Sequence, residues 1–118
     1  MGGLPPLLRD LGKINLLDDN LEEAERLVSE SVKILQENQN PEEFVSLLLL
    51  SDIYLKKALT AARRKELNQE LMFKKQTINT LNQASKIVHS YFPKDSPHIK
   101  RIQDKLSKRR LNLLGLIS

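Results

Sequence analysis

The sequence predicts an all-α fold, on three observations. Glycine and proline interrupt helices, and the 51 residues between Pro41 and Pro93 contain neither. No stretch shows the sustained alternation of apolar and polar residues that is typical of a half-buried β-strand. Valine is also scarce beside leucine. We therefore expect about five helices arranged as antiparallel hairpins, with the second hairpin elongated.

Two helices are expected before residue 40. The first covers residues 4–17 and begins with two prolines, which fit the opening turn of a helix. The second covers residues 21–39, with Asn20 as its N-cap and two glutamates in its first turn, where the helix dipole favours negative charge. We expect one apolar face of this second helix to be buried, and it consists of Leu21, Ala24, Leu27, Val28, Ile34 and Leu35.

A third helix is expected to begin at Pro41. Asn40 is its predicted N-cap, and Glu43 is placed to close a capping box. A single helix from there to residue 92 would be about 75 Å long and would have no partner. We therefore expect the chain to reverse within residues 62–69, which form its most polar stretch.

The fourth helix is expected to end near Tyr91, and the fifth begins at Pro97 with Ser96 as its N-cap. The apolar positions of the fifth helix are Ile99, Ile102, Leu106 and Leu113. We interpret residues 1–118 as one helical-repeat domain, with a first hairpin at 4–39, an elongated second hairpin at 41–92 and a capping helix at 97–114.

Four consecutive leucines occupy positions 47–50. A helix with one buried side needs an apolar residue every three or four positions, whereas consecutive residues point about 100° apart. All four leucines can be buried only where a helix has neighbours on most of its sides. We therefore expect the third helix to lie inside a row of helix pairs, where each buried leucine contributes roughly 1.5–3 kcal/mol.

An internal repeat supports this row. Residues 11–15, LGKIN, match residues 50–54, LSDIY, at an offset of 39, and residues 31–35, SVKIL, match residues 84–88, ASKIV, at an offset of 53. The second unit therefore has 14 more residues between its helices than the first, which is about four helical turns. Shared equally, they lengthen each leg of the second hairpin by about two turns and predict a protruding arm.

The repeated pattern resembles the tetratricopeptide repeat family, in particular its kinesin-light-chain type. The likeness is carried by LGKINLLDDNLEEAE, by LSDIY and by ASKIVHSYFPKDSPHI, and it covers about residues 4–60 and 77–99. It implies two helix pairs and a capping helix, with Gly12 and Ser51 as small residues that let helices approach closely. It also implies a non-catalytic adaptor, scaffold or assembly subunit that binds other proteins.

The sequence departs from the family at several positions. Thr77 and Thr80 stand where apolar residues are expected, and Lys108 and Arg109 stand where a third repeat needs smaller or apolar groups. We therefore interpret the last helix as a cap. An unrelated antiparallel helix bundle stays open as an alternative.

Family likeness also implies an inner groove lined by the first helix of each pair. The residues expected there are Arg9, Lys13, Leu16, Leu48, Asp52, Leu55 and Lys56. This mixture of charges and apolar groups suits a short peptide or helix of a partner, in particular an acidic and apolar one. The arm, residues 59–73, is a second candidate interface, for a partner or for a second copy of the chain. Its apolar residues either form an exposed strip or pack within the hairpin, and they are Leu67, Leu71, Met72 and Phe73.

No catalytic, metal or cofactor site is expected. The chain has no cysteine, which excludes thiolate chemistry and cysteine–zinc sites. His89 and His98 have no nearby carboxylate at metal-ligand spacing, and the acidic residues of 18–25 lack the central glycine of a calcium loop. No glycine-rich phosphate loop or hydrolase motif occurs. We therefore expect no enzyme activity.

The charge distribution leaves two other functions open. Residues 1–43 carry a net charge of −6, whereas residues 44–97 and 98–118 each carry +5. Basic clusters can neutralise phosphates, so a nucleic-acid-associated role stays an alternative, although no interleaved aromatic residues supply a stacking platform. A helical bundle that mainly self-associates is the other alternative. The basic residues are Arg63, Arg64, Lys65, Lys74, Lys75, Lys100, Arg101, Lys105, Lys108, Arg109 and Arg110.

The sequence also predicts where the protein works. Its longest apolar run is the four leucines at 47–50, far below the roughly 20 residues that cross a bilayer. The start, MGGLPPLL, lacks the basic and apolar segments of a secretory signal. Together with the absence of cysteine, this predicts a cytoplasmic protein with no membrane span.

Overall fold

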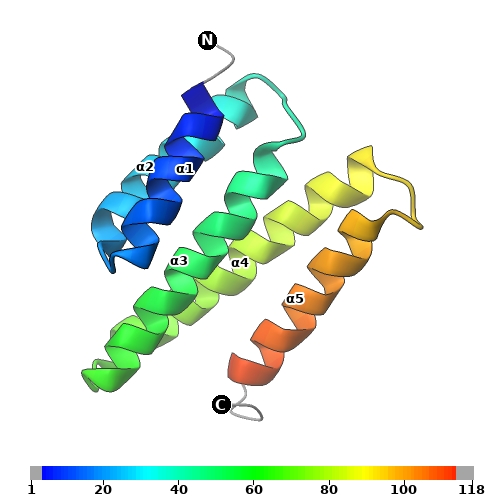
Figure 1. Cartoon of the computed structure of the whole chain (residues 1–118). Helices are drawn as coiled ribbons and strands as arrows, with labels where there is room; N and C mark the ends of the chain where they lie inside the picture. Colours follow the sequence, from blue (N-terminus) through cyan, green and yellow to red (C-terminus); the bar gives the residue numbers. More distant parts are fainter. Residues whose placement is uncertain (1–3, 114–118) are drawn as a thin grey trace.

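Five α-helices make up the part of the chain that the computed structural model describes, which is residues 4–113 for the backbone and 4–108 for the side chains. No β-strand occurs in this part, which confirms the predicted all-α class (Figure 1). The helices are α1 (Leu4–Leu17), α2 (Leu21–Glu37), α3 (Glu43–Arg63), α4 (Leu67–Tyr91) and α5 (Pro97–Leu113).

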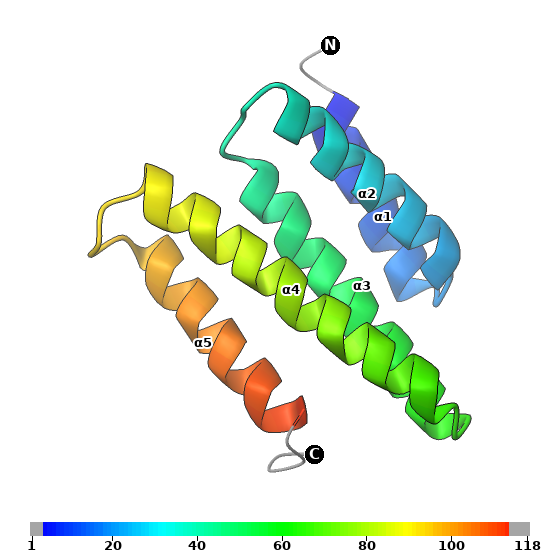
Figure 2. The ribbon, with the colours of Figure 1, turned by 180° about the vertical axis from the view of Figure 1, so that it is seen from behind.

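The helices form two layers. In Figure 1 helices α1, α3 and α5 lie in the nearer layer, and Figure 2, which is the view from behind, has α2 and α4 in front. Each helix packs against the next one in the chain, and α1 also contacts α3. Helix α3 therefore has neighbours on several sides, as the four leucines predict.

The second hairpin is longer than the first, as the internal repeat predicts. Helix α3 has 21 residues against 14 in α1, which is seven more, and α4 has 25 residues against 17 in α2, which is eight more. The chain reverses at residues 64–66, within the predicted 62–69. Figures 1 and 2 both show this end of α3 and α4 projecting past the first hairpin. We call residues 59–73 the arm.

The helix starts agree in part with the sequence prediction. Ser96 Oγ accepts a hydrogen bond from the backbone N–H of His98 at 3.2 Å, and Asn40 Oδ1 accepts one from Glu42 N–H at 2.9 Å. The prediction for Asn20 is wrong, because its side chain makes no capping bond and donates instead to Asn15 Oδ1 at 3.0 Å. Helix α3 also begins at Glu43 rather than at Pro41, because the first turn after Asn40 is tight and bonds three residues apart.

The hairpin turns share one geometry that has no sequence signature. At the end of α1, α2 and α3, a residue other than glycine adopts a left-handed backbone conformation, and two amide groups bond back to carbonyls of the last turn. Gln39 has a φ of 51°, for example, which ends α2 at Glu37 instead of at the predicted residue 39. The three left-handed residues are Asp19, Gln39 and Lys65.

All four leucines at positions 47–50 are buried, with exposed fractions of 1%, 4%, 8% and 7%. They divide between two apolar clusters on different sides of α3. Leu47 and Leu48 pack with residues of α4 and α5, including Leu81 and Ile102, whereas Leu49 and Leu50 pack with residues of α2. The prediction that α3 is covered from most sides is confirmed.

The predicted apolar faces are also buried for the most part. On α2, Ala24, Leu27, Val28 and Leu35 are buried, while Leu21 and Ile34 are half-buried. On α5, Ile99, Ile102 and Leu106 are buried, and the side chain of Leu113 lies outside the described residues. Thr77 and Thr80 on α4 are buried as well. Their hydroxyls donate hydrogen bonds to the carbonyls of Phe73 and Gln76, at 2.8 and 2.7 Å, which allows these polar side chains to lie in the core.

Gly12 lies at a close contact between α1 and α2. A Cβ atom added at this position would overlap Val28 Cγ2, well inside 3.0 Å. At the equivalent position of the second hairpin, Ser51 is fully buried and its hydroxyl donates to the Leu48 carbonyl at 2.6 Å. The packing of α1 against α2 therefore needs the absence of a side chain at Gly12, and Ser51 is a small buried residue at the corresponding place.

A small polar network joins α1, α2 and α3. Ser31 Oγ and Ser46 Oγ are 2.7 Å apart, and both side chains are fully buried. Ser31 also donates to the carbonyl of Pro5 at 3.3 Å, and Arg9 donates to Ser46 at 3.3 Å. These bonds satisfy the two buried hydroxyls where the first hairpin meets the second.

Candidate protein-binding surfaces

A groove of about 180 Å³ crosses the layer formed by α1, α3 and α5. Helix α3 supplies its floor, through the buried side chains of Leu48 and Leu49 and the more exposed Val45. Helices α1 and α5 supply the two rims. The groove is lined by Lys13, Phe44, Val45, Leu48, Leu49, Asp52, His98, Arg101 and Lys105.

The rims of the groove carry positive charge. Lys13 on α1 and Arg101 on α5 are both exposed, and α3 lies between them. Lys105 Nζ lies 3.4 Å from Asp52 Oδ2, and this ion pair ties α5 to α3. The arrangement places two exposed cations on opposite sides of an apolar floor.

One end of the groove is closed by aromatic rings. The His98 ring centroid lies 5.4 Å from that of Phe44 and 4.8 Å from that of Phe92, and the two phenylalanine rings meet edge to face at 5.6 Å. These contacts pin the loop between α4 and α5 against the start of α3. His89 is on the other side of α4, where its Nδ1 lies 2.7 Å from the carbonyl of Ser85.

The predicted groove residues do not form one surface. Lys13, Leu48 and Asp52 line the groove, but Leu48 is buried in its floor. Arg9 is half-buried and points to Ser46 and, at 3.9 Å, to Glu42. The others lie elsewhere: Leu16 is half-buried against the α2–α3 cluster, Leu55 is half-buried, and Lys56 pairs with Asp19 at 3.6 Å.

The sequence prediction missed the contribution of α5 to the groove. Treating the last helix as a cap left His98 without a binding role, and it left Arg101 and Lys105 as candidates only for the nucleic-acid alternative. The spacing of three and four residues between them was the signal, because it places all three on one face of a helix. The adjoining Phe44, Val45 and Leu49 of α3 were missed as well.

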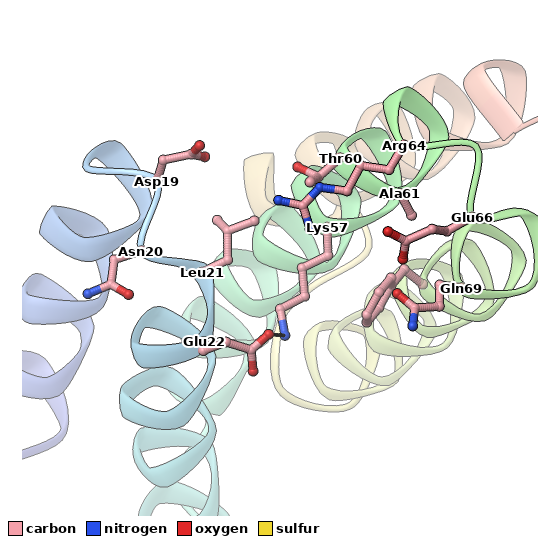
Figure 3. A pocket seen from close by; sticks show the side chains of 11 residues that line it. Asp19, Asn20, Leu21, Glu22, Lys57, Thr60, Ala61, Arg64, Glu66 and Gln69 are labelled. Carbon is pink, nitrogen blue, oxygen red and sulfur yellow. Dashed lines mark hydrogen bonds and ion pairs between the residues drawn. The ribbon is translucent and has the colours of Figure 1, made fainter.

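A second cavity, of about 300 Å³, lies between the first hairpin and the arm (Figure 3). In Figure 3 the Lys57 side chain extends from α3 toward Glu22 on α2. Lys57 is only 7% exposed; its Nζ donates to Glu22 at 3.0 Å and also to Glu25, and it lies 5.3 Å from the centroid of the Phe73 ring. The cavity is lined by Asp19, Asn20, Leu21, Glu22, Lys57, Thr60, Ala61, Arg64, Glu66, Gln69 and Phe73.

The charges at Lys57 are balanced within the protein. Burial by itself lowers the pKa of Lys57, but the hydrogen bonds to Glu25 and Glu22 outweigh burial and raise the pKa above its usual value. For the nearby Tyr54 hydroxyl, burial disfavours the charged form and raises the pKa. Lys57 therefore acts as a brace between α2 and α3, and sequence reasoning missed it because nothing local marks a lysine as buried.

The apolar residues of the arm are mostly exposed. Leu67 and Leu71 are 63% and 54% exposed, and Met72 is exposed too, whereas Phe73 is half-buried beside Lys57. The sequence left two alternatives open for these residues. Leu67, Leu71 and Met72 form an exposed strip, whereas Phe73 packs within the hairpin. A second exposed apolar surface, on α1, was not predicted and consists of Leu4, Leu7, Leu11, Ile14 and Leu17.

The basic residues are spread over several elements. Arg63, Arg64 and Lys65 are exposed at the turn of the arm, while Lys74 pairs with Glu70 at 2.7 Å and Lys75 is exposed on α4. On α5, Lys100, Arg101 and Lys108 are exposed and Lys105 is half-buried. The side chains of Arg109 and Arg110 lie outside the described residues.

Within residues 4–113, no helix combines the length and the apolar character needed to cross a membrane. Among the described side chains, no group of three or more histidine, aspartate or glutamate residues is arranged to hold a metal ion. Comparisons with protein-family models, with curated proteins and with solved structures found no match to this chain.

Proposed function

We propose that this protein is a non-catalytic adaptor or assembly subunit, and that its groove binds a short acidic and apolar segment of a partner protein. The observation that carries the proposal is the pair of exposed cations, Lys13 and Arg101, on opposite rims of an apolar floor. An extended segment or a short helix in the groove would place apolar side chains over Val45 and Leu49 and its carboxylates near the two rims.

The resemblance to tetratricopeptide repeats supports this proposal. Two consecutive hairpins, with equivalent small residues at Gly12 and Ser51, agree with the expected arrangement of such repeats. In that family the first helices of successive pairs line the ligand groove, and here the groove is lined by residues of α1, α3 and α5. A non-catalytic role is supported by the contacts of the two histidines. The His98 ring packs against the rings of Phe44 and Phe92, and His89 Nδ1 lies 2.7 Å from the Ser85 carbonyl, so both take part in local packing. The absence of cysteine supports a cytoplasmic location.

Charge complementarity gives this binding a specific dependence on salt. Rim charges act mainly on the association rate and on the choice of partner, and added salt screens them. Burial of partner side chains on the apolar floor supplies the part of the affinity that salt does not weaken. We therefore expect binding that weakens, but persists, as the salt concentration rises.

The proposal is tested with a library of short labelled peptides in three sets of equal length, which are acidic–apolar, basic–apolar and acidic–polar. Binding is measured by fluorescence anisotropy for the wild-type protein and for the double variant Lys13→Glu with Arg101→Glu. We expect the acidic–apolar set to contain the binders, and the double variant to weaken their binding by about tenfold or more.

The matched control reverses two exposed lysines on the other layer, Lys33→Glu on α2 with Lys86→Glu on α4, which changes the net charge by the same amount. This control should bind like the wild type. The proposal is contradicted if no acidic–apolar peptide binds, or if both double variants lose binding equally. Capture of a labelled single-stranded RNA in place of these peptides would also contradict it and would favour the nucleic-acid alternative.

A further inference from the structure

The exposed apolar surface of α1 is a regular stripe. Leu4, Leu7, Leu11 and Ile14 follow one another at intervals of three, four and three residues, which places them along one face of the helix. Leu7 and Ile14 are 54% and 55% exposed. This face points away from α3, because Arg9 and Lys13, which face the groove side, lie on the opposite side of α1. We call these four residues the α1 stripe.

The α1 stripe is bordered by carboxylates. Asp10 lies beside it on α1 and is exposed. On α2, Glu23, Leu27, Glu30 and Ile34 share one face, at intervals of four, three and four residues. The opposite flank of α2 carries the glutamates that bind Lys57 on α3, so the face with Glu23 and Glu30 adjoins the outer side of α1. Arg26 neutralises Glu23, and Glu30 is left exposed.

A second stripe of similar length runs along the start of α4. Leu67, Leu71, Lys74 and Ile78 follow one another at intervals of four, three and four residues, which places them on one face of α4. Leu71 and Ile78 line a shallow depression with Lys74 and Lys75. We call these residues the α4 stripe.

The border of the α4 stripe is basic. Lys75 lies within the depression and is exposed, and the cations at 63–65 lie at the turn from which α4 starts. This segment has two acidic residues: Glu70 pairs with Lys74, and Glu66 lines the cavity on the Phe73 side of α4, away from the stripe. The two stripes are therefore similar in length, and their borders carry opposite charge.

The two stripes cannot meet within one molecule. Helices α2 and α3 lie between α1 and α4. The α4 stripe also faces away from the first hairpin, because Phe73, roughly 140° around the same helix, is the residue that faces Lys57. The stripes therefore look outward from opposite sides of the molecule, and only another chain can bring an α4 stripe to an α1 stripe.

We infer that the α1 stripe of one copy binds the α4 stripe of a second copy, so that the protein associates head to tail. Leucine and isoleucine side chains of the two helices interdigitate, and the basic border of α4 faces the acidic border of α1. A symmetric contact between two α1 stripes is disfavoured, because it would bring Asp10 and Glu30 of both copies together. Since the two contacting surfaces differ, the contact leaves one free stripe at each end and adds further copies until a ring closes or a filament forms.

The test uses one variant for each surface. The first carries Leu7→Glu with Leu11→Glu, and the second carries Leu67→Glu with Leu71→Glu; all four side chains are exposed, so the fold should be kept, and circular dichroism checks this. The mass of each protein is measured by sedimentation over a wide concentration range. We expect the wild type to grow in mass with concentration, and each variant alone to stay a monomer.

An equal mixture of the two variants is the decisive sample. The first variant keeps its α4 stripe and the second keeps its α1 stripe, so the mixture should form a dimer and nothing larger. A control with Leu59→Glu and Tyr91→Glu, two exposed side chains outside both apolar surfaces, should associate like the wild type. The inference is overturned if the wild type stays a monomer up to millimolar concentration, if either variant alone still assembles, or if the mixture stays monomeric. None of these results depends on the groove, whose residues are unchanged.

Discussion

Replacing Gly12 by alanine tests how closely α1 must approach α2. The added methyl group would overlap Val28 Cγ2, while its next contacts, to the Ala24 carbonyl and Val28 Cβ, lie at ordinary distances of 3.7 and 3.8 Å. Valine in a helix holds one side-chain rotamer, so Val28 cannot turn its methyl group aside without strain. The substitution therefore forces the two helices apart at a fully buried site.

The size of the effect follows from two opposing terms. Overpacking a core costs about 1–3 kcal/mol, and alanine in place of glycine in a helix returns about 1 kcal/mol. We expect Gly12→Ala to lower the free energy of unfolding by up to about 2 kcal/mol. In a Val28→Ala background the overlapping methyl group is gone, so the same Gly12→Ala change should raise the stability, by up to about 1 kcal/mol.

The assay is urea unfolding followed by far-ultraviolet circular dichroism for the wild type, the two single variants and the double variant. These four proteins form a double-mutant cycle, in which the coupling between Gly12 and Val28 is the measured quantity. The sign of the Gly12→Ala effect should change with the background. Equal effects in both backgrounds would refute the argument that Val28 sets the helix spacing.

Two other predictions concern single side chains. Gln39→Gly and Lys65→Gly should each raise the free energy of unfolding, by up to about 1 kcal/mol, because both residues have left-handed backbone conformations that only glycine adopts without strain. Gln36→Gly, within the last turn of α2, should instead lower it by about 1 kcal/mol, and stabilisation of neither turn would contradict the reasoning. Lys57→Met should cost roughly 1–3 kcal/mol at neutral pH, because it leaves a half-buried carboxylate unpaired. The pKa of Lys57 is raised in the folded state, so its stabilising effect is fully present below the ordinary value of 10.5 and is lost as the pH rises through the higher folded value. The stability difference between Lys57→Met and the wild type, measured by urea unfolding, should therefore close only at strongly alkaline pH. Both proteins carry Tyr54→Phe in this comparison, because Lys57 also acts on the pKa of Tyr54. A gap that closes near neutrality would disprove the assignment.

The helices were predictable because their signals are local. Prolines, cap residues and apolar spacing placed the start of α1, α2 and α5 correctly, and the offset between the two repeats gave the length of the arm. The burial of the four leucines followed from geometry alone, since no single neighbour covers four directions. The errors at Asn20 and Gln39 arise at turns, where the backbone conformation depends on the tertiary contacts of both flanking helices.

The candidate surfaces were less predictable, because they depend on which helices become neighbours. The groove was expected from α1 and α3, but the position of Arg101 opposite Lys13 depends on α5 packing beside α3. The same limit applies to the α1 stripe: its spacing is that of a buried face, and only the arrangement of the helices leaves it exposed. Lys57 is the opposite case: its local sequence predicts an exposed lysine, but the structure buries it between α2 and α3.

The additional residues of the second hairpin are confined to its free end. At the offset of 39 residues, α1 corresponds to residues 43–56 of α3, so the seven extra residues of α3 are 57–63, which begin at the Lys57 brace and run to the turn of the arm. Seven residues make about two turns, which returns the helix to nearly the same angular phase. Shortening or lengthening each leg by seven residues beyond Lys57 would therefore change how far the arm projects and leave the packing of the two hairpins unchanged.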